Sequence, residues 1–172
     1  MATVNRNRLF QVALVGAAAL LIVAMFWYLG IVELPGEDQY SGPATVVVAD
    51  ENGTEKAVIE VEVADTRQER FTGLSDHESL ADGEGMWFVY DTESQHTYVM
   101  RRMDFPLDII FVGEDGRINS IHHRRAPGPN EDGNDITATG TGQYVLEVPR
   151  GYANETGIEV GDYVEAHYND SA

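Results

Sequence analysis

The sequence contains no cysteine, and Lys56 is its only lysine. The absence of cysteine excludes disulfides, thiolate metal sites, a cysteine nucleophile and a lipid-modified N-terminal cysteine. Basic residues are scarce as a class, because 11 lysines and arginines stand against 29 acidic residues and give a formal net charge of −18. The phosphates of nucleic acid would repel so negative a chain, and we therefore exclude nucleic acid as a partner.

The excess of acidic residues has two explanations. The protein could bind cationic partners, or it could come from a salt-rich environment, in which acidic surfaces keep proteins soluble. All acidic residues lie beyond residue 32 and are dispersed along that part of the chain instead of forming one block. Dispersed charge of this kind describes solubility better than it describes a binding site, so a halophilic origin is favoured.

A long uncharged segment near the N-terminus predicts a membrane anchor. Residues 9–32 form a run of 24 positions without a charged residue, and about 20 apolar residues suffice to span a bilayer as a helix. Trp27 and Tyr28 lie near the end of the run, where aromatic rings prefer the interface. Arg6 and Arg8 precede the run, so the positive-inside rule places the N-terminus in the cytoplasm and the rest outside.

A cleavable signal peptide is the alternative for this segment. Its hydrophobic region would be shorter and would end in small residues, whereas Ala17 to Ala19 lie in the middle of the run. We therefore expect a single-pass protein of the cell membrane that is held in the bilayer by Leu9 to Leu29. The expected parts are a cytoplasmic tail (1–8), a transmembrane signal anchor (9–32), a linker (33–43) and an exterior β domain (44–172).

The exterior part is predicted to be mainly β, a compact β-sandwich or open barrel with one or two short helices. Short runs of β-forming residues are separated by turn residues such as Asn52-Gly53 and Glu114 to Gly116. The expected strands are 44–50, 56–64, 86–90, 96–100, 107–112, 117–123, 143–149 and 163–168.

Two short helices are expected between these strands. Thr66 and Glu69 match a capping box, and Gly73 fits the position that follows the last turn of a helix. A second helix is expected over residues 151–156, with Gly157 as its cap.

Residues 126–142 are predicted to form a long irregular loop. Such a loop is usually functional or mobile, and Asn130, Asp132 and Asp135 are possible oxygen ligands of a calcium ion. Alignment with an EF-hand loop would put Gly128 and Thr139 at positions that require carboxylates. The match therefore fails, and a solvated acidic loop is expected.

Three stretches of the sequence occur in an order that is typical of one family. They are VEVADTRQERFTGLSDHESLADGEGMWFVYD, HTYVMRRMDFPLDIIFVGEDGRINSI and YVLEVPRGYANETGIEVGDYV, and together they cover about residues 58–164. The chain therefore resembles domain-of-unknown-function family number 192, an uncharacterised protein family of bacteria and archaea. The resemblance implies a compact, mostly β domain that is often exported and membrane-attached, and it implies no activity. Val99 and Arg102 depart from the family, which usually has an aromatic residue and an asparagine there.

The expected strand 107–112 carries a carboxylate, Asp108, between apolar residues. A buried carboxylate must be paired, hydrogen-bonded or protonated. Arg101 and Arg102 precede this strand, and an arginine can grip a carboxylate with two hydrogen bonds. Asp108 is therefore expected to be buried and ion-paired with one of them. The pair would form either a structural clamp or a pocket in which the arginine binds an anionic group.

We expect a non-enzymatic module that binds a small ligand, an envelope polymer or a protein partner. The candidate ligand-binding residues are Arg101, Arg102, Asp108 and His96. The sequence matches no metal-binding histidine motif, activated serine or phosphate-binding loop, so no metal, cofactor or catalytic residue is assigned. The alternative is a hydrolase-like enzyme that uses Asp108 with His96 or His122. A third class, a structural partner of another membrane protein, would require a flat apolar patch.

Three N-x-[ST] sequons fall in the expected exterior part, so their asparagines are candidate glycosylation sites. They are Asn52, Asn154 and Asn169.

Overall fold

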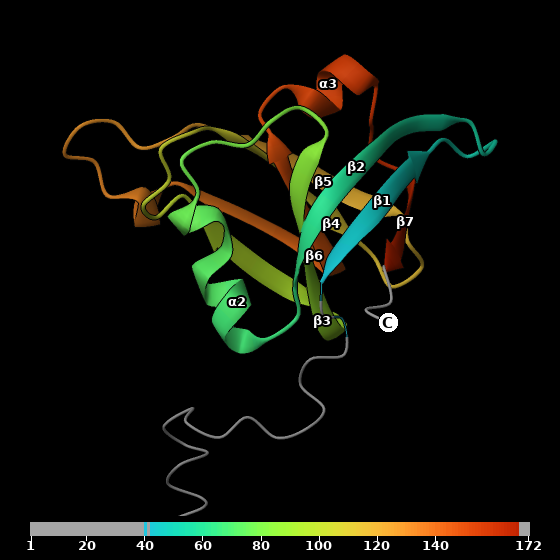
Figure 1. Ribbon diagram of the computed structural model, residues 1–172, viewed down its shortest axis with the longest axis horizontal. Coiled ribbons are helices and arrows are strands. Elements are labelled where there is room, and N and C mark those ends of the chain that lie inside the picture. The colour runs from blue at the N-terminus through green and yellow to red at the C-terminus, as the bar shows by residue number, and fades with distance from the viewer. Residues whose placement is uncertain (1–39, 41, 169–172) are drawn as a thin grey trace, which may run out of the picture. The chain divides into compact units, whose positions relative to one another are not determined.

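The computed structural model describes residue 40 and residues 42–168. This part of the chain is mainly β, as the sequence predicts (Figure 1). Its strands are β1 (Pro43–Ala49), β2 (Glu55–Ala64), β3 (Glu84–Val99), β4 (Leu107–Val112), β5 (Ile118–Arg124), β6 (Thr137–Pro149) and β7 (Tyr163–Tyr168). Its helices are α2 (Arg67–Thr72), α3 (Tyr152–Thr156) and the single-turn 3₁₀ helices η1 (Gly73–Asp76) and η2 (Gly133–Asp135).

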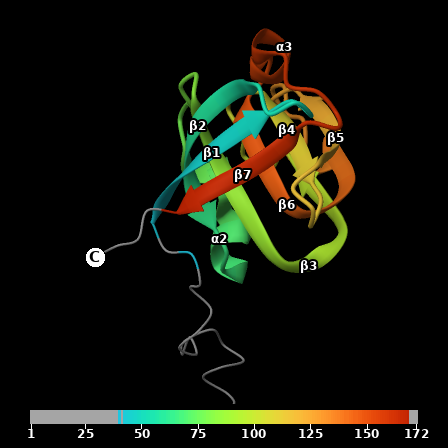
Figure 2. The ribbon, with the colours of Figure 1, turned by 90° about the vertical axis from the view of Figure 1, so that its right-hand side faces the viewer.

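The strands form one seven-stranded sheet in the order β5-β4-β6-β3-β2-β1-β7. The expected sandwich would have two sheets, so the open-barrel alternative describes the fold better. The sheet curls so strongly that its two edge strands approach each other (Figure 2). They meet at one antiparallel bridge between Arg117 and Tyr163, and the N–H of Ile118 donates to the carbonyl of Asp162 at 2.9 Å.

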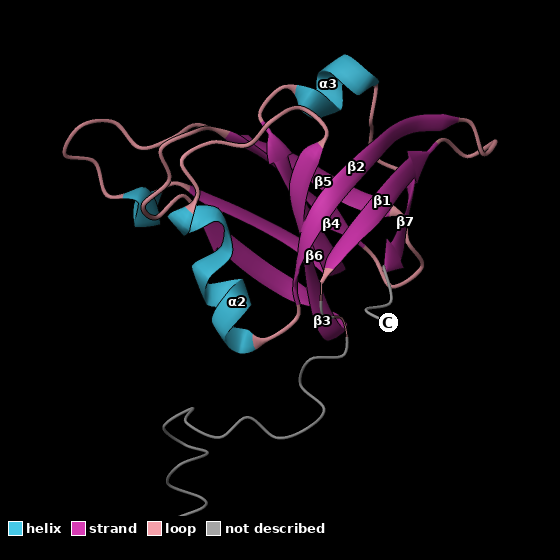
Figure 3. Ribbon diagram, viewed as in Figure 1, coloured by secondary structure: helices cyan, strands magenta, loops and turns pink. Residues whose placement is uncertain are grey.

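The β2–β3 pair is parallel, whereas the other neighbouring strands are antiparallel. A parallel pair needs a crossover connection, and here residues 65–83 provide it. This connection carries α2 and η1 and lays them beside the sheet, while α3 lies at another end of the domain (Figure 3). The crossover therefore builds one wall of the cavity described below.

Apolar side chains form a core on each side of the central strands. All six residues of β4 are buried, with Ile110 and Val112 in one core and Leu107, Ile109 and Phe111 in the other. A strand covered on both faces needs apolar residues at nearly every position, and this explains why LDIIFV lacks a polar alternation. Strands β1 and β2 bury alternate residues on a single face.

Two expected boundaries were wrong. Residues 86–90 and 96–99 belong to one long strand, β3, which ends one residue before the expected end and whose pairing with β6 is irregular between Val89 and Ser94. The last six residues of the expected loop 126–142 are strand, because β6 begins at Thr137. Gly140 is glycine for a steric reason and does not mark a loop. An added Cβ there would lie 2.5 Å from the Phe111 ring, so glycine permits the close approach of β6 to this side chain of β4.

The helix signals of the sequence are confirmed. Thr66 and Glu69 form the reciprocal hydrogen bonds of a capping box before α2, and Gly73 ends the helix with a φ of 49°. Gly157 caps α3 with a φ of 74°, a left-handed conformation that favours glycine. In the described part of the chain no helix is long and apolar enough to cross a membrane. The expected anchor at residues 9–32 lies outside the described residues, and it stays a prediction.

Candidate functional site

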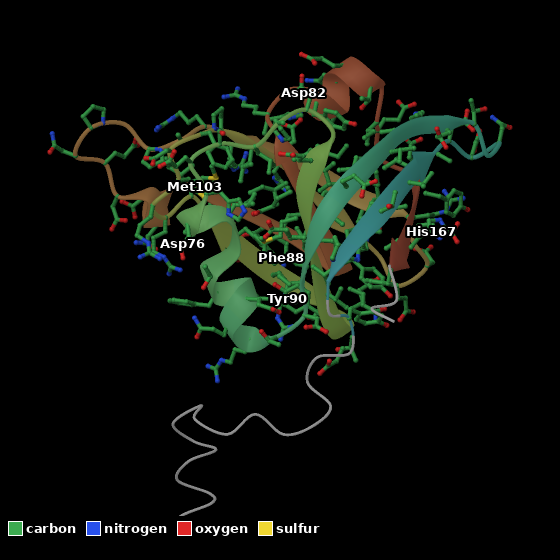
Figure 4. All side chains as sticks on the ribbon, in the orientation of Figure 1. Asp76, Asp82, Phe88, Tyr90, Met103 and His167 are labelled. Carbon is green, nitrogen blue, oxygen red and sulfur yellow. The ribbon has the colours of Figure 1, made fainter. Side chains whose placement is uncertain are left out.

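A cavity of about 230 Å³ lies between the α2–η1 segment and the sheet. Residues 70–75 form one wall, β3 and the residues that follow it form another, and β6 contributes one side chain, Glu147. Phe88 and Tyr90 line the cavity from β3 and lie beside α2 (Figure 4). The cavity opens to solvent near Phe71, whose side chain is 62% exposed.

The carboxyl group of Glu147 lies at the buried end of this cavity. Strand β6 lies between β3 and β4, so Glu147 has Met86 on one side and Ile109 on the other. Glu147 is 5% exposed, and no described residue donates a hydrogen bond to its side chain. Burial penalises the charged form and raises the pKa of Glu147 to about 8. The side chain is therefore a neutral carboxylic acid at pH 7.

Two tyrosine hydroxyls accompany this carboxyl group. The hydroxyl oxygens of Tyr90 and Tyr98 are 2.8 Å apart and share one hydrogen bond. Burial raises the pKa of both phenols, that of Tyr98 well above its ordinary value, and the nearby Glu147 raises both further. The Tyr98 ring is held edge-on against Phe88 and Phe111. The cavity thus presents fixed neutral hydroxyl groups beside the acid.

Two arginines line the same cavity. The Arg70 guanidinium lies 4.9 Å from the centre of the Tyr90 ring and donates a hydrogen bond of 2.9 Å to the carbonyl of Val89. The Arg101 guanidinium lies 4.2 Å from the centre of the Phe71 ring and donates to the Phe71 carbonyl. Neither arginine forms a salt bridge within the described residues. Both can therefore offer N–H groups and positive charge to a ligand.

Asp108 is buried as expected, but its expected partner was wrong. Its side chain is 0% exposed, and its Oδ1 lies 2.5 Å from Nδ1 of His123, the residue directly opposite in the β4–β5 register. Its Oδ2 accepts hydrogen bonds from the backbone N–H groups of Gly151 and Ala153 at 3.0 and 3.1 Å. Neither Arg101 nor Arg102 forms a salt bridge with Asp108, because the β4–β5 register places His123 opposite it. Asp108 is a clamp that joins β4, β5 and the start of α3.

The other candidate ligand-binding residues are separated by the fold. Arg101 lines the cavity, whereas Arg102 is exposed, 3.9 Å from a carboxylate oxygen of Asp76, and lines a shallow depression beside the 127–134 loop. His96 stacks on Tyr90 with 3.7 Å between ring centres, and its Nε2 lies 3.1 Å from the carbonyl of Gly142. Burial lowers the pKa of His96. Of the four candidates, only Arg101 reaches the cavity directly.

The histidine pairing expected for a hydrolase was also wrong. Asp108 contacts His123, and neither His96 nor His122 is hydrogen-bonded to it. The His122 ring packs against Phe111, and its Nδ1 lies 3.1 Å from a guanidinium nitrogen of Arg124.

The remaining site predictions concern metals and sugars. Within residues 42–168 no group of three or more metal-ligating side chains comes together. Asn52 is exposed in the turn between β1 and β2, and Asn154 is exposed in α3. Asn169 lies outside the described residues. Whether any of the three carries a sugar stays a prediction.

Sequence reasoning missed Glu147 as a candidate site residue, although it predicted that residues 143–149 form a strand. A signal is present in the sequence, because Leu146 and Val148 flank Glu147 as Leu107 and Ile109 flank Asp108. In both strands an acidic residue between apolar neighbours indicates a buried carboxyl group.

The chain is similar to a known family and to solved structures. The model of the DUF192 family, described as "Uncharacterized ACR", matches residues 47–166. A solved structure from Sinorhizobium meliloti 1021, with a suggested role in transcription regulation, is 26% identical. The alignment covers 76% of this chain and 98% of that one, with a TM-score of 0.64.

A second solved structure, a protein of unknown function from Novosphingobium aromaticivorans DSM 12444, is 36% identical. The alignment covers 70% of this chain and 83% of that one, with a TM-score of 0.61. Among curated proteins no significant match was found. The family match spans most of the chain and includes at least part of every strand of the sheet, and the protein therefore belongs to the DUF192 family.

Proposed function

We propose that the protein is a membrane-tethered exterior domain that binds a small molecule in the Glu147 cavity without transforming it. The observation that carries this proposal is Glu147 itself, a buried carboxyl group that faces a cavity and accepts no hydrogen bond from a described residue. A buried polar group without a partner costs free energy. A ligand that supplies the partner recovers this cost, and such an arrangement is typical of a binding site.

Binding is favoured over hydrolysis by the composition of the cavity. Hydrolysis of a glycoside normally requires two carboxyl groups, and general acid–base catalysis commonly uses a histidine. Glu147 is the single carboxyl group among the residues that line the described cavity, and no histidine lines it. The Ser75 hydroxyl donates to the carbonyl of Arg101 and has no base beside it. The Asp108–His123 pair belongs to a different part of the domain.

The arginines indicate which small molecules to test first. Arg70 and Arg101 supply positive charge in a protein whose formal net charge is −18, so a ligand with an anionic group has two partners in the lining of the cavity. The regulatory role suggested for the Sinorhizobium neighbour does not extend to DNA contact here. The dispersed acidic residues oppose an approach to a phosphate backbone. An envelope polymer or a protein partner would have to present an equally small group to this cavity.

The membrane tether rests on the sequence of residues 1–32. Arg6 and Arg8, the uncharged run 9–32 and the acidic residues that follow support a cytoplasmic N-terminus and an exterior domain. A domain held at the outer face of a membrane meets small molecules that arrive from outside, and this suits a binding role.

The proposal is tested by a thermal-shift screen of small carboxylates, phosphates and amino acids on the full-length protein in detergent and high salt. A ligand at 100 times its Kd should stabilise the domain by about 2.7 kcal/mol, or several degrees of Tm. Arg101→Gln should abolish the shift, and Arg102→Gln, a matched change of an exposed arginine outside the cavity, should retain it. Equal loss in both variants, or a library without any stabilising compound, would contradict the proposal.

A further inference from the structure

The Glu147 cavity brings a carboxyl group and two guanidinium groups into one lining. Its buried end has the carboxyl group and two phenol oxygens. The Arg101 guanidinium lies beside the exposed Phe71 ring, and the Arg70 guanidinium lies over the Tyr90 ring. No salt bridge joins Glu147 to Arg70 or Arg101 within the described residues. The acid and the guanidinium groups are therefore available to two different groups of one ligand.

From this arrangement we propose that the ligand is a zwitterion, with an ammonium group that pairs with Glu147 and a carboxylate that Arg70 and Arg101 bind. This inference rests on the proposed function, because it names the class of molecule that the same cavity takes.

The buried end suits an ammonium group better than any neutral donor. An ammonium group brings three N–H donors and a positive charge, and the described residues offer neither to the Glu147 carboxylate that forms when the acid loses its proton. Phe88 and Tyr98 line the same space with aromatic rings, whose faces attract cations. The two tyrosine hydroxyls share one hydrogen bond, so their oxygens retain lone pairs that can accept further N–H donors.

A ligand of a single charge fits this cavity less well. An anion alone would satisfy the arginines, leave Glu147 without a donor and approach a domain rich in acidic residues. A cation alone would satisfy Glu147 but would share the cavity with the positive charges of Arg70 and Arg101. A zwitterion has no net charge and pairs with both the acid and the guanidinium groups.

Binding of an ammonium group has a consequence for protons. The titratable or charged groups that face Glu147 are Tyr90 and Tyr98 from β3, Arg70 from α2 and Arg101 after β3, whereas the adjacent β4 contributes apolar Leu107. The phenols stay protonated and the guanidinium groups stay charged near pH 7. Glu147 is therefore the group that must lose a proton when the ligand binds. Because its pKa is about 8, affinity should rise roughly 50-fold from pH 6 to pH 8.

Isothermal titration calorimetry with a series of ω-amino acids, from glycine to 6-aminohexanoate, tests the inference on the full-length protein in detergent and high salt. The series varies the separation of the two charges, and each member is compared with the fatty acid of equal length that lacks the ammonium group. At least one amino acid should bind tenfold more tightly than its control. The buffer takes up any proton that binding releases, so the observed enthalpy depends on the protonation enthalpy of the buffer. The difference between titrations at pH 7 in PIPES and in Tris should therefore correspond to the release of nearly one proton.

Two variants separate the contributions of the acid and of the guanidinium groups. Glu147→Gln should weaken the amino acid at least tenfold at pH 8, remove the pH dependence and leave the fatty acid within twofold. Arg101→Gln should weaken both compounds. If the fatty acids bind as tightly as the amino acids and depend on Arg101, the zwitterion is refuted and the cavity is still a binding site. Affinity that falls as pH rises, or a series without any binding, also refutes the zwitterion, whereas hits of other chemistry in the thermal-shift screen retain the proposed function.

Discussion

Replacement of Glu147 by glutamine tests whether the fold holds this buried carboxyl group in its neutral form. Burial gives the folded protein a pKa of about 8 at Glu147, against an ordinary value of 4.5. Between these two values the folded chain keeps a proton that the unfolded chain has lost, so stability decreases as the pH rises. The full stability is present below pH 4.5, and the loss is complete once the pH exceeds about 8.

The magnitude follows from the size of the pKa shift. One pKa unit corresponds to about 1.4 kcal/mol. At pH 7 the wild type should therefore have lost about 3 kcal/mol relative to a chain with a neutral side chain, and at pH 5 about 1 kcal/mol. Glutamine has nearly the same shape as glutamic acid and carries no charge. Glu147→Gln should accordingly be more stable than the wild type by these amounts.

The measurement is urea unfolding of both proteins between pH 5 and pH 8 in the same high salt. Glu78→Gln, at an exposed position, is the matched control and should stay within about 0.5 kcal/mol of the wild type. A Glu147→Gln variant that is no more stable at pH 7, or whose advantage does not shrink toward pH 5, would refute the reasoning. Such a result would mean that the Glu147 carboxylate has an ionic partner in solution.

Three further predictions concern the clamp, the packing of β6 and the topology. Asp108→Ala should destabilise the domain by about 3–5 kcal/mol in urea melts, because it leaves His123 and two backbone N–H groups without their buried partner, and a loss below about 1 kcal/mol would contradict the clamp. Gly140→Ala should cost about 1–3 kcal/mol because its Cβ would lie 2.5 Å from the Phe111 ring, whereas Gly128→Ala, with 3.5 Å to its nearest neighbour, should be nearly neutral. A protease added to intact cells should remove the β domain, and survival of residues 40–172 until lysis would overturn the exterior topology.

The strands were predictable wherever local chemistry determines them. Asn52-Gly53 marks a turn between two runs of β-branched residues, and the structure pairs those runs as β1 and β2. The capping box of Thr66 and Glu69 set the start of α2. The start of β6 was missed because Thr137 to Gly142 are small and polar. They are strand residues only because β3 pairs with them, and no local pattern reports a distant partner.

The candidate site was harder to predict because it depends on register. Apolar neighbours were enough to predict that Asp108 is buried. Its partner was decided by the β4–β5 alignment, which places His123 opposite and leaves Arg101 to line a cavity elsewhere. The crossover from β2 to β3 brings Arg70 to that cavity from far along the chain. Sequence spacing cannot show such meetings, so the cavity emerged only from the folded structure.

The position of β7 in the sheet has a consequence for the synthesis of the chain. This last strand pairs with β1, the first one, and its residue Tyr163 also bridges to Arg117 beside β5. A ribosome has made every other strand before residues 163–168 emerge, and until then β1 has no neighbour on one side. A nascent or truncated chain therefore has open strand edges that can pair with other chains. Contacts this distant in sequence also form slowly, so the time between synthesis and closure is when the domain is most exposed to aggregation.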